Sequence, residues 1–166
     1  MTETDSTAEQ GPDLLVREGD IAGDYLERLL DIADVDGDID MDVEGERAVV
    51  AIVGEGLTAL VGSGGQTLEA LQELTRLAVV QQTGVRSRLM LDIGGYRAQR
   101  RVELTAIGQQ AAERALQGGA PVSLAAMSPF ERKVVHDAVA AVGGVHSESE
   151  GVEPERRVVV LPDSSS

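Results

Sequence analysis

A glycine-rich corner between two stretches of helical periodicity constrains the fold of this chain most strongly. Its sequence is Val61-Gly62-Ser63-Gly64-Gly65-Gln66-Thr67. Glycine has no Cβ atom, so the chain can turn tightly here, and the first N–H groups of the following helix point outward. Outward N–H groups at a helix start can bind an anion. The segment therefore predicts two helices joined by a tight turn, which is either an anion site or a structural corner only.

The segments around this corner predict a mixture of helices and short strands. The expected order is helix 19–33, strand 38–44, strand 47–53, helix 55–61, the glycine corner, helix 66–82 and strand 86–93. Apolar residues at helical spacing define the first helix. The expected inward stripe is Ile21, Tyr25, Leu29 and Ile32, widened by Leu26 and Leu30. In strand 38–44, strict alternation predicts an apolar face and an acidic face. The acidic face consists of Asp38, Asp40, Asp42 and Glu44.

The second half of the chain predicts a further small α+β domain. Its expected elements are helix 96–116, strand 122–124, helix 129–142, and strands 145–149 and 156–161. Gly94-Gly95 is the expected boundary. The resulting division is a disordered acidic tail over 1–13, a first domain over 14–94, a second domain over 95–162, and a disordered C-terminal tail over 163–166.

The helix expected at 129–142 has a well-marked start. Ser128 is a preferred N-cap residue, Pro129 suits the first helical position, and Glu131 completes a capping box. Arg132 and His136 follow at a spacing of four, which places them on one face of the helix.

The spacing of Arg132 and His136 is consistent with two roles. As a phosphate-binding pair it would act with Lys133, the only lysine, and with Arg156 or Arg157. Strand alternation puts the last two on opposite faces, so at most one of them joins such a patch. The alternative is a half-buried Arg and His that bond only to local partners.

Composition excludes several classes of function. The chain has no cysteine, so disulfides, thiolate metal sites and cysteine nucleophiles are excluded. An aspartate run near residue 36 does not align with a calcium loop, and neither histidine has the neighbours of a catalytic base, so no metal, cofactor, small-molecule substrate or enzyme activity is expected. No apolar run approaches the ~20 residues that span a bilayer, and a cytoplasmic protein without membrane insertion is expected.

Charge is the main argument against a nucleic-acid partner, because the formal net charge is −15. The acidic residues are concentrated in the first half. Residues 1–94 hold 20 acids and 6 bases, a net charge of −14, whereas residues 95–166 hold 9 acids and 8 bases, a net charge of −1. Only three aromatic residues are present, so bases would have to be held by backbone amides, aliphatic side chains and arginine.

The order of elements in the first domain, helix–strand–strand–helix–GxxG–helix–strand, resembles that of a type II KH domain. The segment from Leu60 to Leu68 resembles the signature segment of that domain. In KH domains the GxxG loop clamps the backbone of about four nucleotides. The resemblance implies RNA-binding roles for Gly62, Ser63, Gly64, Gly65 and Gln66. Here the two residues between the outer glycines, Ser63 and Gly64, are uncharged, whereas the family usually places a basic residue there.

The segment from Met127 to Asp137, with Ser147–Gly151 and Arg156–Val160, resembles an R-three-H domain, named for its Arg-x-x-x-His motif. Arg132 and His136 match that motif. A KH domain followed by an R-three-H domain is similar to the bacterial Jag family, over roughly residues 19–161. Many members also carry an N-terminal Jag domain, whereas the sequence here begins with a short acidic stretch.

The resemblance implies a protein that binds single-stranded RNA, or single-stranded DNA, without catalysis. It implies further that this is an RNA chaperone or post-transcriptional regulator, with a small single-KH protein as a partner and a link to cell shape. Arg132, Lys133, His136, Arg156 and Arg157 are the contacts expected in the second domain. The alternative is a protein-interaction module that recruits a basic partner through the acidic face of strand 38–44.

Overall fold

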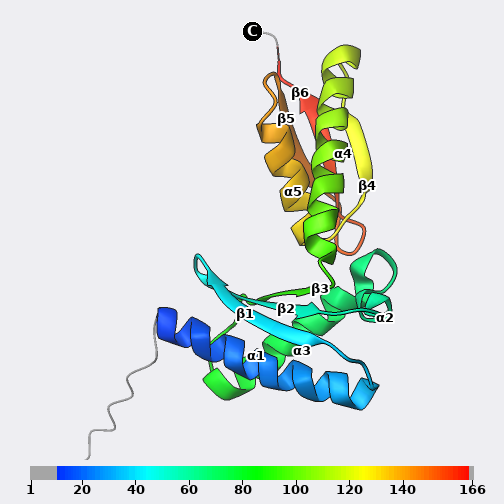
Figure 1. Cartoon of the computed structure of the whole chain (residues 1–166). Helices are drawn as coiled ribbons and strands as arrows, with labels where there is room; N and C mark the ends of the chain where they lie inside the picture. Colours follow the sequence, from blue (N-terminus) through cyan, green and yellow to red (C-terminus); the bar gives the residue numbers. More distant parts are fainter. Residues whose placement is uncertain (1–10, 165–166) are drawn as a thin grey trace, which may run out of the picture. The chain divides into compact units, whose positions relative to one another are not determined.

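The computed structural model describes residues 11–164, which form two compact units divided between Tyr96 and Arg97 (Figure 1). Residues 1–10 of the predicted N-terminal tail and residues 165–166 of the predicted C-terminal tail lie outside this range. Within it, no helix combines the length and apolar character that crossing a membrane requires. Both units mix helices with a small three-stranded sheet, so the predicted α+β class is confirmed.

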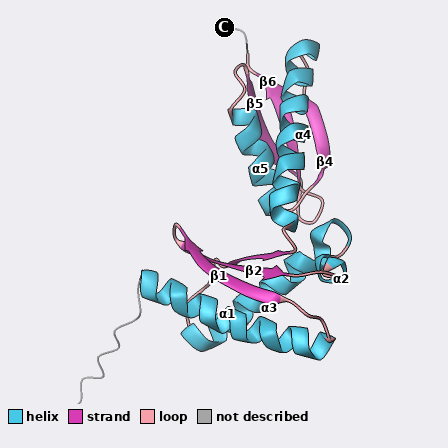
Figure 2. Ribbon diagram, in the orientation of Figure 1, coloured by secondary structure: helices cyan, strands magenta, loops and turns pink. Residues whose placement is uncertain are grey.

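The first unit has the predicted order of elements. These are α1 (Pro12–Ala33), β1 (Asp38–Glu44), β2 (Arg47–Val53), α2 (Thr58–Val61), a 3-10 turn (Ser63–Gly65), α3 (Gln66–Thr83) and β3 (Met90–Ile93). The sheet order is β1-β2-β3, with β1 antiparallel to β2 and β2 parallel to β3. Helix α1 contacts β1 and β2, α3 contacts β3, and the two helices contact each other, so they form one layer against the sheet (Figure 2).

Close packing of β1 on α1 depends on small residues in the helix. Gly19 and Gly23 are buried, and a Cβ atom added to Gly23 would lie 2.9 Å from the sulfur of Met41. Met41 therefore lies against α1 although it is 49% exposed. The predicted alternation of β1 is confirmed, because Ile39 and Val43 are half-buried and all four acidic side chains are exposed.

Two expectations for the first helix are wrong. The helix begins at Pro12, inside the stretch predicted to be tail, because proline is well suited to the first turn of a helix. Ile32 is 87% exposed rather than inward-facing. The other expected positions are confirmed, because Ile21, Leu26 and Leu30 are buried and Tyr25 and Leu29 pack against the core. Ile32 lies in the last turn of the helix.

Two other elements are shorter than expected. Helix α2 has only four residues, because the segment after β2 turns at two glycines with positive φ before it can become helical. The last strand of the first unit starts at Met90 rather than residue 86, and the segment before it follows an irregular path.

The second unit contains α4 (Tyr96–Gly118), β4 (Val122–Ala126), α5 (Pro129–Ala140), β5 (Val145–Glu150) and β6 (Arg157–Pro162). Tyr96, the first residue of α4, still belongs to the first unit and is partly buried against the core of that unit. The sheet order is β4-β6-β5, with both pairs antiparallel. The core is built from α4, α5 and the valines of β5 and β6. Gly108 brings α4 close to α5, since a Cβ atom there would lie 2.9 Å from that of Ala138.

Candidate nucleic-acid interface

The glycine corner is a tight turn whose glycines are required for different reasons. Gly62 ends α2 with φ 75° and ψ 176°, and a Cβ atom there would collide with Thr67, including its backbone nitrogen at 2.9 Å. Gly65 caps α3 at φ 79°, and a Cβ atom there would lie 2.8 Å from the ring of Tyr96. Gly64 also has positive φ, 61°, but faces open space. Two of the three glycines therefore serve packing, and Gly64 serves only the turn.

The exposed part of the corner is made of backbone and short polar side chains. Ser63, Gly64, Gln66 and Thr67 are exposed, whereas Gly65 is buried. The turn is closed by a hydrogen bond of 3.3 Å from the Gly65 N–H to the carbonyl of Gly62. Among the described residues, no side chain caps the start of the 18-residue helix α3. Its positive end therefore lies at an exposed turn, which is a suitable arrangement for an anion.

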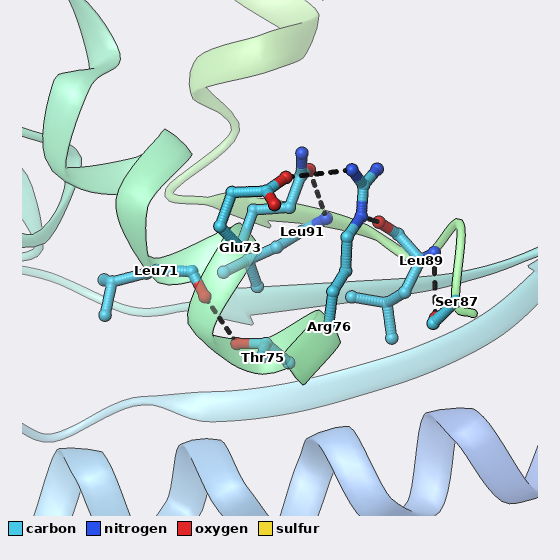
Figure 3. A network of polar contacts seen from close by, with 8 residues as sticks. Leu71, Glu73, Thr75, Arg76, Ser87, Leu89 and Leu91 are labelled. Carbon is cyan, nitrogen blue, oxygen red and sulfur yellow. Dashed lines mark hydrogen bonds and ion pairs between the residues drawn. The ribbon is translucent and has the colours of Figure 1, made fainter. Parts of the chain in front are cut away.

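A network of polar contacts fixes α3 against the strand beside it (Figure 3). The side-chain oxygen of Gln72 accepts a bond of 3.1 Å from the N–H of Leu91, and Arg76 donates through Nε to the carbonyl of Leu89 at 2.8 Å. Ser87 accepts from the Leu89 N–H at 3.2 Å. These bonds satisfy backbone groups of the irregular segment before β3 and of β3 itself, and they tie α3 to that strand.

Sequence reasoning missed a group of arginines in this acidic unit. Burial lowers the pKa of Arg47, and the charges of Arg88 and then Arg76 lower that pKa further. Arg76 also pairs with Glu73 at 3.1 Å. The three arginines come from β2, from α3 and from the segment before β3, so only the fold brings them together.

In the second unit, the start of α5 has the predicted capping box. The Glu131 N–H donates to the Ser128 hydroxyl at 3.3 Å, and the Ser128 N–H donates to the Glu131 carboxylate at 3.1 Å. Pro129 occupies the first turn. Both bonds satisfy donors that would otherwise be orphaned at the helix end, so the direction of α5 and of its side chains is well defined.

Arg132 is buried and already bonded on both sides of its guanidinium group. One terminal nitrogen donates to the Met127 carbonyl at 2.7 Å, and the other pairs with the Glu153 carboxylate at 2.6 Å. The Arg132 side chain is 10% exposed and that of Glu153 is 51% exposed. The arginine therefore fastens α5 to the loop that leads into β6, through a carboxylate that water can reach.

His136 lies between α5 and β5, with both ring nitrogens bonded to serine hydroxyls. Nδ1 is 2.6 Å from Oγ of Ser147, and Nε2 is 2.8 Å from Oγ of Ser149. Burial holds the pKa of His136 below its usual range, and the charge of Arg132 lowers it further, whereas Asp137 raises it by a smaller amount. The imidazole is therefore neutral at pH 7. It has one donor and one acceptor nitrogen for the two hydroxyls.

The other predicted contacts are Lys133 on α5 and two arginines, one before β6 and one at its start. Lys133 is exposed and pairs with Asp137 at 3.3 Å. Arg156 lies in the loop before β6 and donates to the Gly151 carbonyl at 2.7 Å. Arg157 begins β6 and is exposed. Because β6 starts only at Arg157, the expectation that the two arginines alternate across one strand does not apply.

Sequence reasoning did not assign Ser147, Ser149 or Glu153 to this site. The two serines alternate along β5, so a shared face could have been read from their spacing. Nothing in the sequence indicates that this face meets His136, 11 and 13 residues earlier in the chain. Glu153 lies in a loop, where no periodicity predicts a partner.

Comparisons with known proteins agree with the architecture of the second unit. The sequence matches the R-three-H domain family over residues 102–162, a range that includes Arg132 and His136, so the expected domain is confirmed. A protein of Clostridium symbiosum described as RNA-binding protein KhpB is 32% identical over 143 residues, 85% of this chain and 64% of the relative.

Two further relatives carry the same description. The protein of Lactiplantibacillus plantarum is 31% identical over 82% of this chain and 42% of its own length. The protein of Bacillus subtilis is 29% identical over 82% of this chain and 66% of its own length. The chain thus spans between 42% and 66% of the length of these three relatives.

Proposed function

Because this chain contains an R-three-H domain and is homologous to the KhpB proteins of the Jag family, we propose that it binds single-stranded RNA without catalysis. The observation that carries the proposal is the match to the R-three-H family across the segment that holds Arg132 and His136. The relatives described as RNA-binding proteins are matched over 82% to 85% of this chain, so the likeness extends well beyond that domain.

In this proposal the first unit is a type II KH domain. The order of its elements and the exposed turn at Ser63–Gly64 support the assignment. Backbone amides at the start of α3 would hold one stretch of RNA backbone, as GxxG loops do. Because neither Ser63 nor Gly64 carries charge, this contact relies on the N–H dipoles at the start of α3.

The second unit would hold a neighbouring phosphate through Arg132, Lys133 and His136, with Arg156 and Arg157 as further contacts. The geometry sets a condition on this contact. Arg132 is already paired with Glu153, so an RNA phosphate has to replace that carboxylate. Glu153 is half-exposed and can move into water. The neutral imidazole donates to one of the hydroxyls of Ser147 and Ser149 and accepts from the other, so one hydroxyl keeps its proton free for a phosphate.

Two weak sites on one chain bind a common strand more tightly than either alone. Once one site is occupied, the other meets the same RNA at a high effective concentration. This offsets the weakness of an uncharged GxxG loop. We further propose a cytoplasmic role as an RNA chaperone or post-transcriptional regulator, with a single-KH protein as a partner, and this extension rests on the family resemblance. Single-stranded DNA presents the same phosphates and is expected to bind as well.

A protein-interaction module is the second candidate, favoured by one observation. All four acidic side chains of β1 are exposed along one edge of the first sheet. A basic protein partner would fit this edge. Under this candidate the glycine corner is structural only, and RNA affinity is negligible.

Salt dependence separates the two candidates. For a single strand, log K falls by about 0.7 per phosphate contact for each log unit of salt. The doubly substituted Arg132→Ala/His136→Ala protein is expected to flatten that slope, while circular dichroism checks that it stays folded. An unchanged slope in the folded variant contradicts the second-unit site.

The glycine corner has its own test. Gly64→Asp adds a negative charge at a position with open space around it, and aspartate tolerates the left-handed backbone better than most residues. RNA affinity is expected to fall while thermal stability changes little. Unchanged affinity would favour a purely structural corner.

A further inference from the structure

Phe130 is the single aromatic side chain in residues 97–166, and two arginines of α4 lie over it. The central carbon of the Arg97 guanidinium is 4.9 Å from the ring centroid, and that of Arg101 is 5.5 Å away. Phe130 is half-buried at the second position of α5, where the capping box fixes the backbone. The ring is therefore a rigid support at the junction of α4 and α5.

The two arginines differ in what remains accessible. Arg97 is 4% exposed and forms part of the packed structure. Arg101 is exposed. Arg100, which lies between them in sequence, pairs with Glu103 and with Glu131, both at 3.0 Å. Within residues 11–164 no carboxylate pairs with Arg101. Its contact with the Phe130 ring limits the rotamers that the side chain can adopt.

We propose that Arg101, supported by Phe130, is a platform on which one unpaired nucleobase stacks. Unstacked bases are held in proteins by aromatic rings and by the planes of arginine guanidinium groups. An arginine that already lies over an aromatic ring is ordered before the ligand arrives, so little rotamer entropy is lost on binding. This inference rests on the proposed RNA binding and adds a base contact to a site otherwise built from phosphate contacts.

The position of the platform on α5 fits a strand that crosses the helix start. At about 100° per residue, Arg132 lies about 160° around α5 from Phe130, and His136 lies about 120° from it on the same side as Arg132. Lys133 lies between the two faces, about 60° from Phe130, and is exposed. A strand whose phosphate contacts Arg132 and His136 can therefore pass Lys133 and place a base against Arg101.

The test compares oligonucleotides with and without bases. The probes are a fluorescein-labelled 12-residue oligoadenylate and an abasic sugar–phosphate oligomer of the same length. The variants are Arg101→Ala and Arg101→Lys, which keeps the charge but loses the plane. Arg114→Ala is the matched control, because Arg114 is exposed on the same helix and no carboxylate of the described residues pairs with it. It removes the same charge far from Phe130 along α4.

Stacking on a protein side chain contributes enough for a loss of about 5-fold or more per base on alanine substitution. We expect Arg101→Ala to weaken oligoadenylate binding by about that factor, Arg101→Lys to weaken it nearly as much, and Arg114→Ala to have a much smaller effect. On the abasic oligomer, Arg101→Ala and Arg114→Ala should behave alike.

Two results overturn the inference while leaving RNA binding intact. In the first, Arg101→Ala matches Arg114→Ala on oligoadenylate. In the second, Arg101→Ala loses as much affinity for the abasic oligomer as for oligoadenylate, which marks an ordinary phosphate contact. If the unsubstituted protein binds neither oligomer, the proposed function itself fails, and the platform fails with it.

Discussion

Neutralising Glu153 should lower the free energy of unfolding slightly and raise the affinity for RNA. Both effects follow from one ion pair, Glu153–Arg132. Glu153 holds the outer nitrogen of Arg132 at 2.6 Å in the free protein. In the proposed complex a phosphate takes that place. Whatever free energy the pair contributes to the free protein is therefore lost on binding. Glu153→Gln removes the charge but leaves an amide oxygen that can still accept a hydrogen bond.

The size of the effect follows from the exposure of the pair. The Arg132 side chain is 10% exposed, but that of Glu153 is 51% exposed, so water screens the attraction substantially. A pair of this kind contributes about 0.5–1 kcal/mol. Glu153→Gln should lower the free energy of unfolding by up to that amount. Since 1.4 kcal/mol corresponds to a tenfold change, RNA affinity should rise about two- to fivefold.

Fluorescence anisotropy with a labelled single-stranded RNA measures the affinity, and urea unfolding measures the stability. Glu155→Gln is the control, because it removes the same charge two residues away, where no ion pair is present among the described residues. In an Arg132→Gln background the gain from Glu153→Gln should vanish. An affinity gain no larger than that of Glu155→Gln would refute competition between the carboxylate and a phosphate.

Three further predictions concern the fold around the two sites. Gly62→Ala places a side chain against Thr67 at positive φ and should lower the free energy of unfolding in urea by about 2–5 kcal/mol. Gly64→Ala meets open space and should lower it by only about 1–2 kcal/mol. Similar losses for the two variants would contradict the assigned geometry. Ser128→Ala removes one half of the capping box and should lower stability by about 1 kcal/mol by thermal melting, and no change would show that the cap is dispensable. Because the pKa of His136 is lowered in the folded state, the unfolded chain takes up this proton first as pH falls. The stability that the neutral imidazole provides is then complete above about pH 6.5 and is lost below it, so His136→Gln should lose less stability than the unsubstituted protein between pH 7 and 5.5.

Local signals in the sequence were sufficient for most of the fold. Ser128, Pro129 and Glu131 specify where α5 begins, because a capping box involves only neighbouring residues. Strand β2 was predicted with its observed bounds, since an apolar run bounded by a turn and glycines needs little tertiary context. The exposed Ile32 could not be predicted in this way. Its spacing fits the stripe, but it lies in the last turn of α1, and no local pattern shows which turns of a helix pack against the rest of the fold.

The candidate site was only half predictable, because side-chain partners depend on the whole fold. The spacing of Arg132 and His136 placed them correctly on one face of α5. Their bonding partners come from β5 and from the loop before β6, which no local pattern connects to α5. The sequence therefore identifies the two side chains that share a face of α5. Only the fold shows that Arg132 is already paired with a carboxylate.

Equilibrium binding of the purified protein to labelled single-stranded RNA across a salt series tests the central claim most directly. Two sites that hold the sugar–phosphate backbone predict saturable binding in dilute buffer, with log K falling linearly as salt rises, by about 0.7 for each phosphate contacted. Failure to bind at any salt concentration, including the most dilute, would contradict the claim and would favour a protein partner on the acidic edge of β1.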